Sequence, residues 1–302
     1  MSMHRLTAIA IGVPDVAPVA AFYRDFGLAE TSPGVFATRD GGEQLRLVPS
    51  PRRRLLELGV GVDHPDDLER IARSLAALGV PVERSGDDRI AARDAASDVQ
   101  VVVAIAERIA QPPSREARLN LPGVVRRRNA RADSFARAER VAPRKLGHVV
   151  VGSLDADASR RFLCEGLGFA VSDEIPGVGA FLRCSTDHHN VLVQTAPIAF
   201  LHHTAWEVDD VDDVGRGAKA MIDADPSRHV WGLGRHYLGS NYFWYLRDPA
   251  GNFAEYYSDL DVIDDAALWR PEPARGMAGL YSWGPPVPGE FLAPPDLVAS
   301  AA

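Results

Sequence analysis

Residues 201–208 read Leu-His-His-Thr-Ala-Trp-Glu-Val, and this short segment holds the pattern that decides the fold. Its apolar and polar side chains alternate, which is typical of a half-buried β-strand. Three other segments share the alternation, at residues 6–13, 55–62 and 146–153. Helical spacing follows each of the four, at residues 16–26, 65–78, 155–167 and 211–222. We therefore interpret the chain as four copies of one strand–helix unit.

Shorter strands are predicted after each helix, and they complete the repeat as βαβββ. Examples are residues 34–38, 44–48, 179–184 and 190–194. Gly27 and Gly168 stand at equivalent helix ends, where a left-handed residue commonly terminates a helix. The fold class is therefore predicted to be α+β, with four βαβββ units paired into two domains.

The expected boundaries follow from this repeat and from composition. The first pair of units fills residues 1–110 and the second pair fills residues 141–260. Residues 111–140, rich in Arg and Pro, are interpreted as a linker that carries one helix near residues 130–141. The tail, residues 261–302, contains a Pro-rich stretch and is expected to run extended over the surface.

Composition narrows the class of protein. A chain of 302 residues is long enough for about two domains with their own cores. Its formal net charge of −8 argues against a nucleic-acid-binding protein, which is usually basic. Two cysteines make no disulfide framework, and the chain does not open on a signal-peptide pattern, so a cytoplasmic location is expected. No apolar run is long enough to predict a membrane span.

The repeat also provides an internal comparison of the two halves. His148, His203 and Glu255 lie at strand positions of the second half and look like the ligands of a metal site. The alignment of the repeats places His148 on Ala8, His203 on Glu57 and Glu255 on Val101. Because the first half keeps the strands without these side chains, the architecture itself does not require them.

At these residues the chain resembles the vicinal oxygen chelate superfamily. More closely, it resembles the two-domain type I extradiol ring-cleaving dioxygenases of the 2,3-dihydroxybiphenyl 1,2-dioxygenase type. The matching motifs are the turn at 248–251 followed by Glu255, the His-His pairs 188–189 and 202–203, and Gly-Arg-His at 234–236. The resemblance extends to about residue 260. It implies two domains, each an open curved mixed sheet with helices outside, of which only the second binds metal.

The resemblance implies that His148, His203 and Glu255 bind Fe(II), with Mn(II) as an alternative. Two imidazoles and one carboxylate on one face of the metal leave adjacent positions open, which is typical of non-haem Fe(II) oxygenases. A catechol and O₂ would take these positions. Nucleic acid and membrane partners are not expected, whereas a homo-oligomer is expected by analogy with the family.

Three further residues are assigned by the same resemblance. His189 would be the acid–base residue near O₂, and a histidine suits this role because its pKa lies near working pH. Tyr245 would hydrogen-bond the ionised catechol oxygen, and His236 would orient the hydroxyl or assist proton movement. Residues 237–241 depart from the family's sequence, so the resemblance does not identify the substrate.

The predicted function is therefore extradiol (meta) cleavage of a catecholic ring by O₂, in the breakdown of aromatic compounds. Two alternatives stay open. A glyoxalase-like isomerase or lyase would need a second acidic ligand or proton shuttle, which neither Ala8 nor Val101 supplies. A non-catalytic binding or resistance protein would not need His189, His236 and Tyr245.

Overall fold

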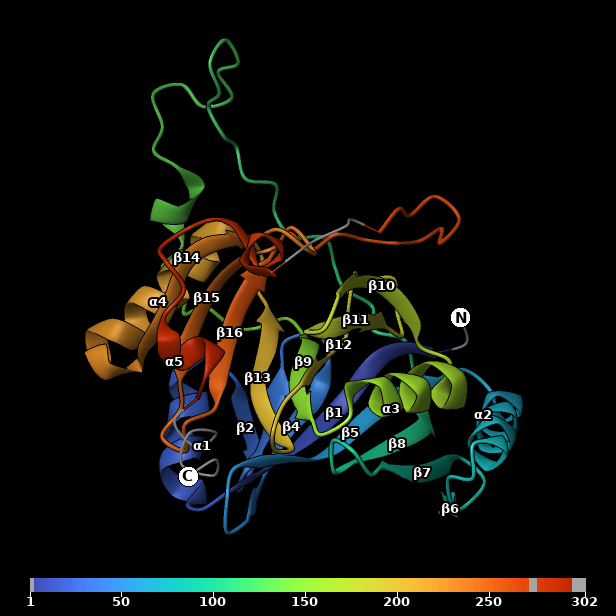
Figure 1. The fold of residues 1–302 in the computed structure, drawn as a ribbon. Helices are drawn as coiled ribbons and strands as arrows, with labels where there is room; N and C mark the ends of the chain where they lie inside the picture. Colours follow the sequence, from blue (N-terminus) through green and yellow to red (C-terminus); the bar gives the residue numbers. More distant parts are fainter. Residues whose placement is uncertain (1–2, 272–275, 295–302) are drawn as a thin grey trace.

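Two mixed β-sheets form the protein, and helices lie along their outer sides in the computed structural model, which describes residues 3–271 and 276–294 (Figure 1). The strands of the first sheet are β1 (Met3–Val13), β2 (Ala29–Ser32), β3 (Val35–Thr38), β4 (Gly42–Pro49), β5 (Arg54–Val62), β6 (Glu83–Arg84), β7 (Arg89–Asp94) and β8 (Val99–Ile105). Its helices are α1 (Val16–Asp25) and α2 (Pro65–Ala77).

The second sheet repeats this order with one added strand. Its strands are β9 (Leu146–Ser153), β10 (Ala170–Ile175), β11 (Gly179–Arg183), β12 (Val191–Thr195), β13 (Phe200–Glu207), β14 (His229–His236), β15 (Tyr242–Arg247), β16 (Phe253–Ser258) and β17 (Tyr281–Trp283). Its helices are α3 (Ala156–Arg161), which continues into a π-helical segment (Phe162–Leu167), α4 (Val211–Ala224) and the short α5 (Gly289–Leu292).

Each sheet is built from two βαβββ units, which confirms the predicted fold class. The opening strands of the two units pair antiparallel at the centre, β1 with β5 and β9 with β13. Each opening strand also pairs parallel with the last strand of its own unit, as β13 does with β16. The four central strands of a sheet therefore come from residues far apart in sequence, and they position the site described below.

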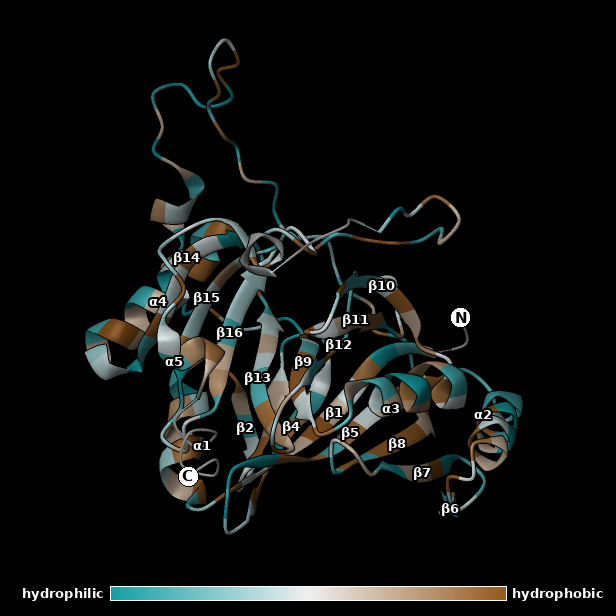
Figure 2. Cartoon of the chain, viewed as in Figure 1, coloured by the Kyte–Doolittle hydropathy of each residue, from teal (hydrophilic) through white to brown (hydrophobic). Residues whose placement is uncertain are grey.

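One apolar core joins the two halves. It takes side chains from both sheets and from the helices between them, and Figure 2 shows the apolar residues concentrated on the strands. The Phe26 ring stacks on the Tyr256 ring at 3.8 Å between centroids, and the Tyr256 hydroxyl donates to the Phe26 carbonyl at 2.6 Å. Gly27, which ends α1, has a φ of +97°, as does Gly168. A β-carbon on Gly27 would lie 2.1 Å from the Val141 carbonyl oxygen, so this contact between the halves requires glycine.

The helix predicted in the linker is absent, and the tail contains more structure than predicted. The linker holds no α-helix near residues 130–141 but only a 3₁₀ turn, Asp133–Ala136, because its apolar side chains find no body surface to pack against. The tail does more than run over the surface. Strand β17 pairs with β14, and Phe291 of α5 is only 4% exposed because it packs in an aromatic cluster beside β16.

The predicted repeat register was also off by one residue at its end. Val101 and Val103 face the apolar core in β8, as Ala254 and Tyr256 do in β16. The first-half counterpart of Glu255 is therefore Val102, not Val101. Neither valine can bind a metal, so the conclusion drawn from the internal comparison is unaffected. In the described part of the chain, no helix is long and apolar enough to cross a membrane.

Candidate active site

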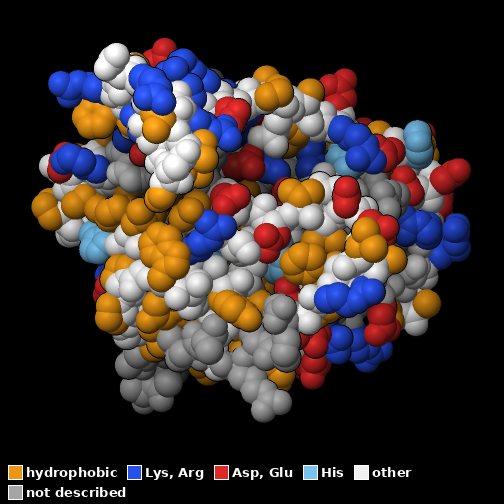
Figure 3. All heavy atoms as spheres, turned by 90° about the horizontal axis from the view of Figure 1, so that it is seen from above, with side chains coloured by type: hydrophobic (Ala, Val, Ile, Leu, Met, Phe, Trp, Pro, Cys, Tyr) orange, Lys and Arg blue, Asp and Glu red, His pale blue; other side chains and the backbone are white. Residues whose placement is uncertain are grey.

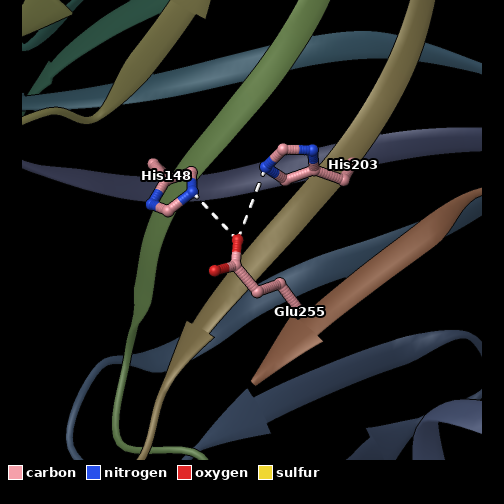
Figure 4. A group of neighbouring side chains, drawn as sticks. All are labelled: His148, His203 and Glu255. Carbon is pink, nitrogen blue, oxygen red and sulfur yellow. Dashed lines mark ion pairs between the residues drawn. The ribbon is translucent and has the colours of Figure 1, made fainter. Parts of the chain in front are cut away.

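Three neighbouring strands of the second sheet bring together His148 from β9, His203 from β13 and Glu255 from β16 (Figure 4). Strand alternation directs them to the same side. Val149 and Val151 face the apolar core, as do the residues before and after Glu255. Because side chains alternate along a strand, His148 and Glu255 point to the opposite face of the sheet. The alternation that predicted the strands therefore also builds the cluster.

The geometry of this cluster suits a bound cation. One donor atom from each residue lies within 4.8 Å of the others. Glu255 Oε2 is 3.2 Å from His148 Nε2 and 3.5 Å from His203 Nε2. Among the described residues, neither Glu255 Oε2 nor His203 Nε2 has a hydrogen-bond partner, although both are buried. Buried carboxylate oxygens are costly unless compensated, and a divalent metal would compensate this one. These residues therefore fit a two-His, one-carboxylate metal site.

Asn241 orients the carboxylate and was missed in the sequence. Its Nδ2 donates to Glu255 Oε1 at 3.0 Å, which leaves Oε2 facing the two imidazoles. Asn241 lies four residues before Tyr245 and directly precedes β15, which continues the alternation between them. Counting back by twos from Tyr245 along this strand would have placed Asn241 on the same face.

The His-His pair at the start of β13 fixes the tautomer of His203. His202 Nε2 lies 2.7 Å from the Phe291 carbonyl oxygen, which can only accept, so this nitrogen carries a proton. Neutral His202 then has a lone pair on Nδ1, 2.8 Å from His203 Nδ1, which must donate. The lone pair of His203 is therefore on Nε2, which faces Glu255. His202 itself contacts a predicted ligand and lines the pocket.

The second His-His pair repeats this arrangement. His188 Nε2 lies 2.7 Å from Asp173 Oδ2, and its Nδ1 lies 3.0 Å from His189 Nδ1. The carboxylate accepts from Nε2–H, and in the neutral ring His188 Nδ1 therefore accepts from His189 in turn. His189 is thereby left with a free lone pair on Nε2. Its ring lies 4.1 Å from the ring of His148, between centroids, beside the proposed ligands.

The tail fixes a third imidazole. His236 Nδ1 donates to the Leu280 carbonyl oxygen at 2.7 Å, so its Nε2 accepts from the Tyr245 hydroxyl at 2.8 Å. Tyr245 and Glu255 are cross-strand partners in β15 and β16. Two tail carbonyls, at Leu280 and Phe291, therefore hold histidines of the site, and nothing in the sequence of residues 261–302 signals these contacts.

The electrostatics favour the neutral form of three imidazoles, those of His189, His203 and His236. Burial, together with neighbouring histidines, lowers the pKa of His189 and that of His203 well below the ordinary value. Burial also lowers the pKa of His236. For Tyr245, burial and the nearby Glu255 carboxylate raise the pKa well above the ordinary value. The pocket thus presents neutral nitrogen donors and a protonated phenol beside a single carboxylate.

A cavity of about 430 Å³ opens onto this cluster. Five of the six predicted site residues line it, and the sixth, Glu255, is fully buried against the His148 and His203 imidazoles. The remaining wall is mostly apolar, with Gln194 and Thr195 as polar exceptions, and its apolar side chains are Val150, Ile175, Val178, Phe181, Leu192, Leu238, Leu280, Phe291 and Leu292. The cavity is large enough for a substituted aromatic ring.

Comparison with known proteins agrees with this geometry. Residues 145–256 match the Glyoxalase/Bleomycin resistance protein/Dioxygenase superfamily. The chain is 32% identical to metapyrocatechase 2 of Cupriavidus necator, over 96% of this chain and 92% of that one. It is 26% identical to the manganese-dependent 2,3-dihydroxybiphenyl 1,2-dioxygenase of Geobacillus genomosp. 3, over 92% of both chains.

Solved structures show the same fold. Homoprotocatechuate 2,3-dioxygenase from Arthrobacter globiformis superposes with a TM-score of 0.76 at 18% identity, covering 97% of this chain and 91% of that one. The Mn(II)-bound glyoxalase from Novosphingobium aromaticivorans gives a TM-score of 0.75 at 23% identity, covering 94% and 91%. These structural matches extend across both sheets, and the two relatives compared by sequence are named as a metapyrocatechase and a dioxygenase. The chain belongs to the glyoxalase/bleomycin resistance protein/dioxygenase superfamily and, within it, to the two-domain extradiol dioxygenases.

Proposed function

We propose that this protein is a metal-dependent extradiol dioxygenase that opens a catecholic ring with O₂. The observation that carries the proposal is the convergence of two buried atoms, His203 Nε2 and Glu255 Oε2, that have no hydrogen-bond partner among the described residues and lie beside an apolar pocket that also holds His189. The similarity to metapyrocatechase 2 along nearly the whole chain supports the same activity. The pathway would be the breakdown of aromatic compounds.

His148, His203 and Glu255 would hold a divalent metal, for which we propose Fe(II), with Mn(II) as the alternative. When bound, the metal would hold the two catechol oxygens and O₂ side by side and allow electrons to pass between them. The metal-free half would be residues 1–110 and the catalytic half residues 141–260. Ala8, Glu57 and Val102 stand where the second half has its donors, which supports this division.

His189 would move the protons of the reaction. Because His188 occupies its Nδ1–H, the neutral ring offers a lone pair at Nε2. That nitrogen can take the proton of a catechol hydroxyl and return it to an oxygen atom of the ring-opened product. A group in this role typically contributes about 10²–10⁴ to the rate.

Tyr245 and His236 would hold the other side of the substrate. The Tyr245 hydroxyl now donates to His236 Nε2. In the complex it can donate instead to the ionised catechol oxygen, since its raised pKa keeps its own proton in place. His236, fixed by the Leu280 carbonyl, then keeps a lone pair toward a substrate hydroxyl.

The wall of the pocket favours an uncharged, apolar ring substituent. Among the described lining residues there is no Lys or Arg to pair with a substrate carboxylate. Phe181, Leu192, Leu238 and Phe291 instead offer an apolar surface. Burying an alkyl or aryl substituent against it contributes about 25 cal/mol per Å² of apolar surface, whereas a buried carboxylate would remain unpaired.

The test is oxygen uptake by anaerobically purified protein loaded with Fe(II) or with Mn(II). The panel contains catechol, 3-methylcatechol, 2,3-dihydroxybiphenyl and the charged 3,4-dihydroxyphenylacetate. We expect equimolar O₂ uptake and a yellow ring-fission product, with the apolar substituted catechols preferred in kcat/KM. No uptake with any of them would contradict the proposal. A preference for the charged catechol would contradict only the substrate class. A cytoplasmic location stays a prediction.

A further inference from the structure

Residues 111–140, which we call the arm, project from the body over most of their length (Figure 1). At its base, Arg137 binds Asp210 and Asp213 at the start of α4. Leu119, Leu121, Val124 and Val125 near its tip are 47–56% exposed, and Phe135 nearer its base is 74% exposed. Figure 2 shows apolar residues at the end of the arm. Exposed apolar residues gathered on one projecting segment typically mark a surface that another molecule covers.

The arm has an ordered internal structure. Asn120 Oδ1 accepts from the backbone N–H groups of Arg126 and Arg127 at 2.9 and 2.7 Å. Leu121 and Val124 form a β-bridge, and the Arg118 guanidinium binds the Asp133 carboxylate. The arm therefore keeps its shape through contacts within itself. A preorganised segment pays little additional ordering entropy when it binds.

Charge distinguishes the arm from the rest of the chain. It holds eight arginines and three acidic residues, a formal charge of +5, while the whole chain carries −8. The other residues together therefore carry −13. Figure 3 looks down on the end of the molecule from which the arm rises, and basic and hydrophobic side chains lie together there.

A second projecting segment has the complementary chemistry. Residues 259–268, which we call the acidic segment, contain four aspartates and no basic residue. Asp264 and Asp265 are exposed, and Val262 and Leu268 are 66% and 75% exposed. Part of this segment projects on the same side of the molecule as the arm, while Ile263 is buried against the body (Figure 1).

We propose that the arm of one molecule docks on the acidic segment of a second copy of this chain. Both surfaces combine exposed apolar side chains with charge, and the charges are opposite in sign. Because every copy carries both surfaces, one twofold pairing satisfies two arms and two acidic segments at once. Nucleic acid would attract the arm but would be repelled by the strongly acidic remainder.

Docking there would support the site proposed above. The His188 N–H donates to the Asp261 carbonyl oxygen at 2.8 Å, and the Ile263 N–H donates to the Thr186 carbonyl oxygen at 2.7 Å. The Trp269 ring lies 5.3 Å from the His188 ring, between centroids. The acidic segment thus backs the His188–His189 pair, and a partner's arm would hold it in place. This consequence rests on the proposed function, whereas the docking itself does not.

The test measures the mass of the full chain by light scattering after size exclusion, together with sedimentation. We expect an oligomer for the wild type. Leu121→Asp/Val124→Asp and Arg127→Glu/Arg128→Glu should each lower the mass toward that of the monomer. Control variants change exposed residues of the body, Leu154→Asp and Arg52→Glu/Arg73→Glu, and should leave the mass unchanged.

Charge exchange makes the test specific for the partner surface. Asp264→Arg/Asp265→Arg should dissociate the oligomer, and its combination with Arg127→Glu/Arg128→Glu should restore it. A monomeric wild type, an oligomer that persists in both arm variants, or a failure of the combined variant to reassociate would overturn the proposal. So would a monomer that binds a DNA oligonucleotide through its arm. Oxygen uptake, measured in parallel, reports on the proposed function separately from the mass.

Discussion

His202 and His188 should control different properties of the site, although each makes the same contact with the next histidine. We consider His202→Phe and His188→Phe, which keep an aromatic ring in each buried position. The first change removes the acceptor that places the lone pair of His203 on Nε2. The second removes the acceptor that does the same for His189. We therefore expect His202→Phe to weaken metal binding and His188→Phe to slow catalysis at saturating metal.

The magnitude for His202→Phe follows from the two hydrogen bonds that are lost. They are 2.8 Å long to His203 and 2.7 Å long to the Phe291 carbonyl oxygen. At about 1 kcal/mol each, their loss costs about 2 kcal/mol, or about thirtyfold in metal affinity. This lies within the range of about 10–100-fold found when groups that orient a metal ligand are removed.

The assay is anaerobic competition between protein and a chelator for Fe(II), repeated with Mn(II), on both variants and the wild type. Steady-state oxygen uptake at saturating metal and catechol gives kcat for the same samples. Equal loss of metal affinity in the two variants, or wild-type affinity in His202→Phe, would show that the histidine pairs do not set the tautomers as argued. Thermal unfolding of each metal-free variant identifies any loss that comes from the fold alone.

Three further changes probe the site and its support. Glu255→Gln should abolish stoichiometric metal binding while Val102→Gln, its counterpart in the other sheet, leaves metal content at the wild-type level by elemental analysis. Burial raises the pKa of Asp248 from 3.8 to about 6. Relative to Asp248→Asn, the wild type should therefore lose about 3 kcal/mol of stability as the pH rises from about 4 through about 6. Urea unfolding of both proteins at several pH values measures this difference in stability, and a difference that does not change with pH would contradict the expectation. Phe291→Ala should undock α5 and lower kcat/KM, at a packing cost of about 3–5 kcal/mol, whereas Leu292→Ala, whose side chain is half exposed, should change both far less.

The strands and the candidate cluster could be predicted because one local rule produces both. Alternation along residues 146–153 and 201–208 predicts β9 and β13, and the same alternation places His148 and His203 on one face. The internal repeat then distinguished the predicted metal ligands from residues that only build the strands. Ala8 and Glu57 occupy the equivalent positions in the first half, where the strand pattern is kept without the two histidines. The same alternation also places Asn241 on the face of Tyr245, but it was not identified from the sequence.

The rest of the site depends on contacts that leave no local pattern. The Leu280 and Phe291 carbonyls bind His236 and His202 through the backbone, and any residue offers a carbonyl oxygen. The Pro-rich composition of the tail predicted an extended path, and it gave no sign that one apolar side chain, Phe291, packs in an aromatic core cluster. The alignment of Glu255 with Val101 was wrong because the turn before β8 and the turn before β16 differ in length by one residue. Counting along the sequence cannot show this difference.

The most direct measurement of the central claim is the fate of the two oxygen atoms. Fe(II)-loaded protein is given a catechol with an apolar substituent under ¹⁸O₂, and the product is analysed at once by mass spectrometry. The account predicts a ring opened beside the diol, with both atoms of one O₂ in the product, and no product from Glu255→Gln. A product opened between the two hydroxyl-bearing carbons, or one without label, would contradict it.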